Sequence, residues 1–248
     1  MTLDLSTLLK ASLAVLLVFG AGCDSTADDD TMTEDPVASV AALQADYEAA
    51  LDHLDATVLT TTDGPVSSDV LVDASLDFYA DRYGETSDRY VTLAEGMRGV
   101  QSGAVARAPQ DISPTLESVT LRVDEARQTS VSFVAFQTEL AEIRSDVIAE
   151  DWSARDTENA LAYIALLDSS MEFLRDHAAL AGAPMSNSAR MHHWWDSWGK
   201  CAAGVVGGGI LGGLTGAGAG SVVPAIGTAA GGVAGAIGGG LSGAAAAC

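Results

Sequence analysis

Residues 35–58 read DPVASVAALQADYEAALDHLDATV, a stretch that predicts one amphipathic helix. Asp35 suits the N-cap, where a carboxylate accepts a backbone N–H, and Pro36 suits the first helical position. Apolar residues then recur every three or four positions, which places them on one face. These residues are Val40, Leu43, Tyr47, Leu51, Leu54 and Val58. Such a face must be buried, so the stretch predicts packing against other helices.

Three later stretches repeat this spacing, and no long alternating segment indicates a β-strand. The first runs over residues 69–100 and is expected to break near Gly84. The second opens at Ser113 as one long helix of about nine turns, and the third covers residues 156–178. The sequence therefore predicts an all-α fold, an antiparallel four- or five-helix bundle over residues 36–185. Core packing is the simplest reason for the apolar faces, and a ligand groove, a partner-binding surface or a coiled coil is the alternative.

Residues 201–248 contain no charged side chain, and glycine recurs in them at every fourth position. Residues 221–226, which include Pro224, divide these glycines into two runs. The first run is Gly204, Gly208, Gly212, Gly216 and Gly220, and the second is Gly227, Gly231, Gly235, Gly239 and Gly243. Four residues are slightly more than one helical turn, so each run predicts a groove along one helix face. Because two such grooves allow close backbone packing, the segment predicts a glycine-zipper helical hairpin.

The glycine content limits where these helices can exist. Nine glycines lie in residues 202–220, and at about 0.8–1 kcal/mol each relative to alanine they cost the first arm about 7–9 kcal/mol. The arm therefore needs a partner surface or a bilayer, where backbone groups must be satisfied internally. Each arm is just long enough to span a membrane, although insertion is marginal with so few leucines. Low-complexity disorder is the alternative, and the regularly placed valine, isoleucine and leucine argue against it.

Three of the four tryptophans lie in residues 186–200, directly before the uncharged tail. Trp194, Trp195 and Trp198 are typical of a bilayer interface, where an indole ring is half buried and its N–H stays hydrated. Lys200 can extend its ammonium group to water from the same depth. The segment predicts contact with a membrane, and the alternative is that the rings cap the core of the bundle.

Residues 1–22 have the features of a signal peptide, with an apolar run at 13–19 and small residues before Cys23. The pattern resembles that of bacterial lipoprotein signals, and the resemblance implies that Cys23 is lipidated and becomes the mature N-terminus. The chain departs from that pattern in having Gly20 where leucine is usual, and in offering only Lys10 as a basic residue. An ordinary signal peptide with an incidental Cys23 is the alternative.

With Cys23 lipidated, two cysteines remain, and they bracket the glycine-rich tail. Cys201 and Cys248 come to the same end of a hairpin that turns at residues 221–226. Outside the cytoplasm such a pair is expected to form a disulfide. The chain-entropy model gives the bond about 4 kcal/mol of stabilisation. Two unpaired buried thiols are the alternative.

The formal net charge is −22, and every Asp and Glu precedes residue 200. Neither nucleic acid nor anionic lipid headgroups are expected partners, because both need clustered Lys and Arg. The acidity indicates either ordinary solubility or a protein built for high salt, where self-repulsion is screened. Residues 23–35 are small, polar and acidic, which is typical of a solvated linker.

The sequence contains no recognisable pattern of catalytic residues. It lacks a P-loop, a Rossmann unit, and the metalloprotease and serine-hydrolase motifs, and the helices carry no Glu-x-x-His pair for a di-metal site. His53 and His177 are explained more simply as surface or bundle-edge residues than as ligands. His192 and His193 point in different directions on a helix and make a poor ligand pair, although Asp196, four residues after His192, could share a site with it. Cys201 is explained more simply as half of a disulfide than as a nucleophile. We therefore expect no enzyme, no cofactor and no metal site.

The tail resembles the glycine-zipper two-helix segments of bacterial envelope lipoproteins, and it is similar to the glycine-rich cores of class II bacteriocins. The resemblance covers about a fifth of the chain and rests on the two glycine runs, residues 222–227 and the flanking cysteines. It implies a non-enzymatic lipoprotein of the cell envelope, lipid-anchored and facing the periplasm or the exterior, whose tail associates with the bilayer or with a second copy. A membrane-permeabilising, bacteriocin-like effector is the alternative, and an extracellular helical binding module with an inert tail is a third hypothesis.

Overall fold

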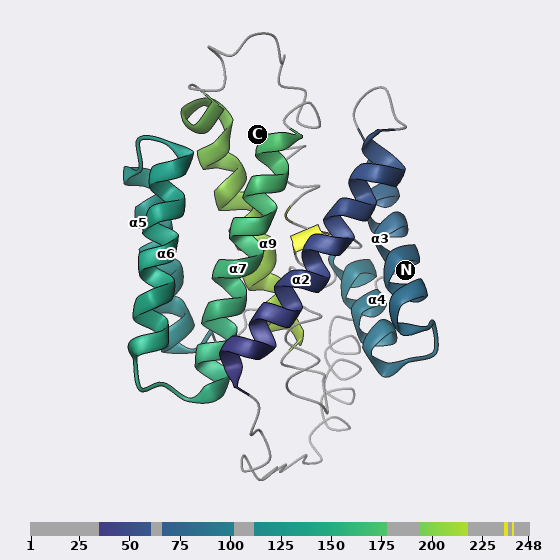
Figure 1. Ribbon diagram of the computed structural model, residues 1–248, viewed down its shortest axis with the longest axis horizontal. Coiled ribbons are helices and arrows are strands. Elements are labelled where there is room, and N and C mark those ends of the chain that lie inside the picture. The colour runs from purple at the N-terminus through teal and green to yellow at the C-terminus, as the bar shows by residue number, and fades with distance from the viewer. Residues whose placement is uncertain are drawn as a thin grey trace, which may run out of the picture. The chain divides into compact units, whose positions relative to one another are not determined.

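The computed structural model describes residues 35–60, 66–101, 112–177 and 194–217, together with Ala236, Ile237 and Gly240. These residues form an all-α fold, which confirms the expected fold class, and no β-strand occurs among them (Figure 1). The α-helices are α2 (Pro36–Leu54), α3 (Ser68–Tyr83), α4 (Asp88–Gln101), α5 (Pro114–Thr129), α6 (Phe133–Ala149), α7 (Ala154–Asp176) and α9 (Lys200–Ala217). Two π-helical turns, η2 (Asp55–Leu59) and η5 (Trp195–Gly199), follow α2 and precede α9.

Three helix boundaries read from the sequence are confirmed, at Asp35, Ser113 and Gly84. Asp35 caps α2 by accepting the backbone N–H of Val37 at 3.0 Å. Ser113 caps α5 by accepting that of Leu116 at 3.2 Å. Gly84 ends α3 with φ of 82°, a left-handed value that a side chain would disfavour, so residues 69–100 form two helices as expected.

The single long helix expected from Ser113 to Val147 is wrong, because the chain folds there as α5 and α6. Ser130 leaves the helical conformation with ψ of 130°, and Ser132 caps α6 by accepting the N–H of Ala135 at 3.1 Å. Serine is favoured at helix ends, because its hydroxyl can hydrogen-bond to nearby backbone groups when the chain is not helical. The two helices then lie side by side, where Arg122 forms an ion pair with Asp146 at 2.5 Å.

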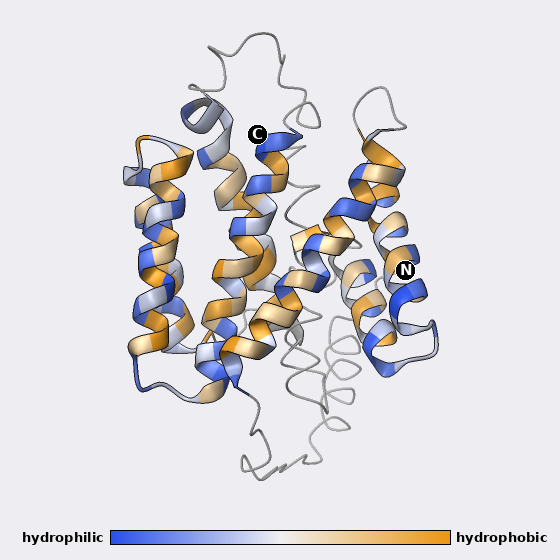
Figure 2. Ribbon diagram, in the orientation of Figure 1, coloured by the Kyte–Doolittle hydropathy of each residue, from blue (hydrophilic) through white to orange (hydrophobic). Residues whose placement is uncertain are grey.

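Helix α7 occupies the centre of the arrangement. It contacts α2, α5, α6 and α9, and every residue from Ala160 to Leu167 is buried (Figure 1). A helix buried all round must be surrounded by others, because no face of it is left for water. Helices α2 and α5 show hydrophilic and hydrophobic bands side by side, as expected of helices that bury one face (Figure 2).

Helices α2 and α7 run parallel. Three contacts between them occur in the same order along both helices. They join Ser39 to Glu158 at 2.6 Å, Tyr47 to Ser170 at 2.7 Å, and Asp55 to His177 at 2.9 Å. The antiparallel packing expected of the bundle therefore does not describe this pair. It does describe α6 and α7, where Gln137 near the start of α6 donates to Asp168 in the second half of α7 at 3.0 Å.

A polar cluster joins α2 to the α3–α4 pair. Arg82, Tyr83 and Arg89 all converge on the carboxylate of Asp46, whose side chain is 13% exposed. The guanidinium of Arg89 also lies over the ring of Tyr83, 4.3 Å from its centroid. A carboxylate with three donors is well satisfied despite its burial, so the cluster fixes how these helices meet.

Candidate functional site

The candidate site is the start of the tail, where η5 and α9 lie against the bundle. Several residues expected to carry function fall outside the described residues. They are Cys23, Cys248, Gly220, Gly227, Gly231, Gly235, Gly239 and Gly243. Gly216 belongs to α9, and the remaining site residues can be placed individually.

One face of α9 belongs to the same hydrophobic core as the bundle. Ala202, Val206, Ile210 and Leu214 are each at most 3% exposed, and α9 packs on α7 and α5. These four residues repeat at every fourth position, as the glycines do. The first arm of the tail is therefore a core helix in this structure, although the glycine penalty makes it unstable alone in water.

The glycine ladder of α9 points the opposite way. Gly204, Gly208 and Gly212 are exposed, and each lies two residues from a member of the buried stripe. Two residues correspond to about 200° of rotation around a helix, so the two stripes lie on opposite faces. A Cβ added at Gly208 or Gly212 would meet no atom within 4 Å. The helix-packing role expected of the ladder stays a prediction, since the ladder faces outward here.

The close contacts of the tail instead involve glycines outside the ladder. A Cβ at Gly207 would lie 2.8 Å from the phenolic oxygen of Tyr163 on α7, and one at Gly240 would lie 3.0 Å from the Cα of Val206. Sequence reasoning missed both. The run of three glycines at 207–209 was the available signal, but nothing in it says which member faces a neighbour.

The three tryptophans are buried in protein. Trp194, Trp195 and Trp198 are 8%, 2% and 5% exposed. The ring of Trp195 stacks on Phe136 of α6 with centroids 4.8 Å apart, and its Nε1 donates to the carbonyl oxygen of Ser130 at 2.9 Å. The rings thus cap the core, the alternative weighed from the sequence. A role at the bilayer interface stays a prediction and requires the rings to leave these positions.

Gly199 makes this tryptophan arrangement possible. A Cβ at residue 199 would lie 2.7 Å from the ring of Trp195 and 2.9 Å from that of Trp194. Distances below 3.0 Å force something to move, and two buried indole rings have little room to do so. The residue therefore needs to be glycine for steric reasons, within a π-helical turn that brings the rings together.

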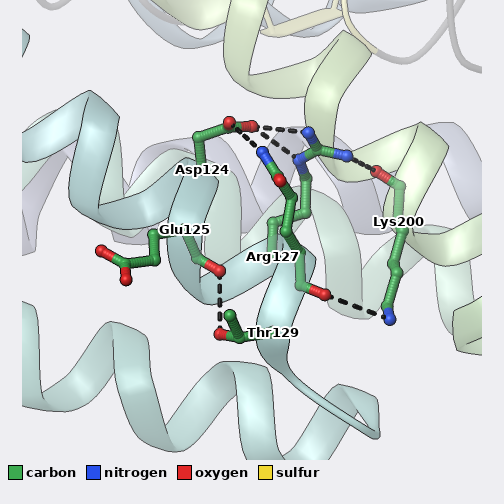
Figure 3. Close-up of polar contacts among 6 residues, drawn as sticks. Asp124, Glu125, Arg127, Thr129 and Lys200 are labelled. Carbon is green, nitrogen blue, oxygen red and sulfur yellow. Dashed lines mark hydrogen bonds and ion pairs between the residues drawn. The ribbon is translucent and has the colours of Figure 1, made fainter.

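A polar clasp joins the end of α5 to the first residue of α9 (Figure 3). Arg127 donates through Nη1 to the carbonyl oxygen of Lys200 at 3.0 Å, while its Nε and Nη2 bind Asp124 at 2.9 and 2.5 Å. The ammonium of Lys200 lies 3.0 Å from Asp196 and 3.5 Å from the carbonyl oxygen of Gln128. Lys200, expected to extend its ammonium group to water at a membrane interface, has protein partners in this structure.

Tyr163 of α7 contacts α9, and its phenol is buried deeply enough for its ionisation to be affected. Burial raises the pKa of the Tyr163 phenol above its ordinary value, and the carboxylate of Asp124 acts in the same direction while Arg127 opposes it. A phenol in such surroundings stays neutral at physiological pH. The contact of Tyr163 with Gly207 is thus a packing contact between uncharged groups.

Cys201 takes part in a disulfide. Its partner lies outside the described residues, so the expected pairing with Cys248 stays a prediction. The bond starts one residue after Lys200, at the same end of α9 as the clasp.

The described residues show neither a cluster suited to a metal ion nor a helix suited to crossing a membrane. The described residues contain no group of three or more His, Cys, Asp or Glu suited to a metal ion. His53 packs beside Phe78, His177 pairs with Asp55, and His192 lies outside the described residues. Among the helices described, none is both long and apolar enough to cross a membrane.

Comparisons of the chain with protein-family models, with curated proteins and with solved structures gave no match.

Proposed function

We propose that this protein is a non-enzymatic bacterial envelope lipoprotein with a structural or interaction role. Lipidated Cys23 anchors it, the acidic helical bundle faces the periplasm or the exterior, and the tail associates with the bilayer or with a second copy. No cofactor, metal or nucleic acid takes part. The lipoprotein-type signal before Cys23 and the uncharged, glycine-rich tail support this assignment.

The observation that carries the proposal is the two-sided character of α9. Its apolar stripe, which includes Val206, Ile210 and Leu214, is buried, whereas Gly204, Gly208 and Gly212 are exposed on the opposite face. A helix that offers apolar side chains on one face and a glycine groove on the other can meet either lipid or another helix. An ordinary core helix would instead carry polar or charged residues outward.

In the proposed tail, the second arm returns to α9 and the two form a hairpin. Ala236 and Ile237 are buried, and Gly240 lies against Val206. These contacts support a second arm folded back on the first. A disulfide from Cys201 to Cys248 would close the open end of the hairpin.

The anchor is tested by intact mass spectrometry of protein extracted from membranes. Acylation at Cys23 is expected, and Cys23→Ser should move the protein to the soluble fraction. Thr26→Ala serves as the control, because it alters the adjoining linker without removing the acceptor thiol or the basic residue of the signal. An unmodified protein that fractionates as soluble would refute the anchor.

The alternative function is a membrane-permeabilising effector acting through the hairpin. The uncharged stripe of α9 favours it, since no charge among residues 201–217 has to be desolvated on entering lipid. The test is dye release from phosphatidylcholine vesicles by the full chain. Release that is abolished by Gly212→Leu, which fills the exposed groove, supports the effector. No release at any concentration, either by this chain or by Gly207→Ala, which disfavours packing of α9 on Tyr163, rules it out.

A further inference from the structure

We propose that the docked position of α9 is an autoinhibited state of the tail, and that the last turn of α5 is the latch that holds it. This inference rests on the proposed membrane function, because it states what must happen before the tail can meet a bilayer. The latch consists of Arg127, Gln128 and Ser130.

Docking hides the side chains that a bilayer would need. Val206, Ile210 and Leu214 are buried in the core that α9 shares with the bundle, and the rings of Trp195 and Trp198 are also buried. What α9 shows to water is mainly the glycine face, which gains little from lipid. The docked tail is therefore a poor membrane ligand until the helix leaves its place.

The polar hold on the tail is concentrated at one end. Arg127 donates to the carbonyl oxygen of Lys200 (Figure 3). The carbonyl oxygen of Ser130 accepts from the indole of Trp195, and that of Gln128 accepts from the ammonium of Lys200. Beyond Lys200 the side chains of α9 are apolar apart from Cys201 and Thr215, so packing supplies most of the rest. Loss of the latch therefore removes three polar contacts at this end of α9 and weakens its docking.

Once released into water, α9 is unstable as an isolated helix. Its glycines disfavour an isolated helix, and undocking exposes the apolar stripe. A bilayer removes both costs, because it buries the stripe and enforces backbone hydrogen bonding within the helix. Lipid therefore acts as the ligand of the released state, and the latch sets how rarely that state is reached.

Two matched pairs of variants test the latch in the full chain. Arg127→Ala removes the donor to Lys200, and Arg122→Ala is its control, since it lies on the same helix and pairs with Asp146. Gly207→Ala places a methyl group against Tyr163, whereas Gly208→Ala makes the same change where a Cβ meets nothing within 4 Å. All four are made with Trp152→Phe, so that tryptophan emission comes only from residues 194, 195 and 198.

Two measurements separate release from membrane contact. Amide hydrogen exchange in water reports opening of α9, and quenching of tryptophan emission by vesicles of bromine-labelled phosphatidylcholine reports rings that reach acyl chains. Arg127→Ala and Gly207→Ala should raise exchange in α9 and quenching roughly ten-fold over their controls, with exchange in α2 and α7 unchanged.

Each other result overturns the proposal. Unchanged exchange in α9 would show that these contacts do not hold the tail, and faster exchange without quenching would show that release does not lead to lipid. An equal rise in α2 would mean global unfolding instead of a latch. Failure of the proposed anchor is separate, because an unacylated Cys23 leaves the ring quenching of these variants unaffected.

Discussion

Tyr163 of α7 and Gly207 of α9 approach so closely that a methyl group on Gly207 would lie 2.8 Å from the phenolic oxygen. Tyr163 is 5% exposed, so its ring has little space into which to move. This single contact reports whether the tail is docked, and it separates Gly207 from the neighbouring glycines of the same run.

We expect Gly207→Ala to be less stable than Gly208→Ala by about 1–3 kcal/mol, the usual cost of overpacking a core. Both substitutions bring the same gain in helix propensity, so that gain cancels in the comparison. Urea unfolding followed by circular dichroism measures the difference. Equal stabilities would show that α9 does not pack on Tyr163 in solution.

Trp195→Phe should destabilise the protein by about 1–3 kcal/mol. The substitution leaves the carbonyl oxygen of Ser130 buried without its indole donor, and an unsatisfied buried group carries its full desolvation cost. Thermal unfolding gives the measurement. Trp152→Phe, at a partly buried position, is the comparison and should cost less. The prediction fails when the two substitutions have the same effect.

Asp168→Asn should stabilise the protein at neutral pH and have little effect in acid. Burial, together with the nearby carboxylates of Glu172 and Glu48, raises the pKa of Asp168, while hydrogen bonding from Gln137 lowers it. A carboxyl whose folded pKa lies above its unfolded value stabilises the fold below the unfolded value, and that contribution is lost as the pH rises through the folded value. The neutral amide removes this loss.

The comparison for Asp168→Asn is Asp77→Asn, which makes the same charge change at an exposed position of α3. Urea midpoints at pH 3 and pH 7 decide the matter. An advantage for Asp168→Asn that persisted unchanged at pH 3 would contradict the assignment.

The protein should lose stability in alkali as its buried tyrosines ionise. Burial raises the pKa of Tyr47, Tyr79 and Tyr163, and burial with hydrogen bonding to Asp46 raises that of Tyr83 to about 12. Because the folded values exceed the unfolded value of 10.0, this stability is fully present below about pH 10 and is lost as the pH rises towards 12 and beyond.

Urea midpoints between pH 8 and pH 12 check this expectation. Tyr163→Phe should lose less stability than the unaltered chain over the same interval, since phenylalanine cannot ionise. A midpoint that stayed constant up to pH 12 would mean that the tyrosines are hydrated in solution.

Deletion of residues 201–248 should lower the stability of the bundle sharply while leaving it folded. Val206, Ile210 and Leu214 each contribute roughly 1.5–3 kcal/mol by burial, a sum that is a large fraction of the stability of an ordinary domain. Near-ultraviolet circular dichroism and the cooperativity of urea unfolding are the measurements. A truncated protein that stayed cooperative and equally stable would favour the hypothesis of a binding module with an inert tail.

Local rules predicted the helix boundaries well, and they failed where the fold depends on distant partners. Asp35, Gly84 and Ser113 act within a turn of their own position, so the sequence around them suffices. The break at Ser130 was harder, because Val123 and Phe133 both lie on apolar faces and the ten-residue gap between them was the only sign that the faces belong to two helices.

The sequence could not predict which face of α9 is buried, for a different reason. Val206, Ile210 and Leu214 repeat with the same period as Gly204, Gly208 and Gly212, so either stripe satisfies the pattern of a buried face. The choice depends on the surface offered by α5 and α7, far earlier in the chain. Periodicity identifies faces, but only the shape of a partner decides which face is used.

Because α2 packs on α7, the hydrophobic core cannot form fully until both helices have been synthesised. Ser39 and Glu158, which bond at 2.6 Å, are 119 residues apart in the sequence. During synthesis α2 therefore emerges long before the helix against which Tyr47 is fully buried. Contacts of such separation close slowly, and a chain that acquires its central helix so late passes through synthesis without a finished core.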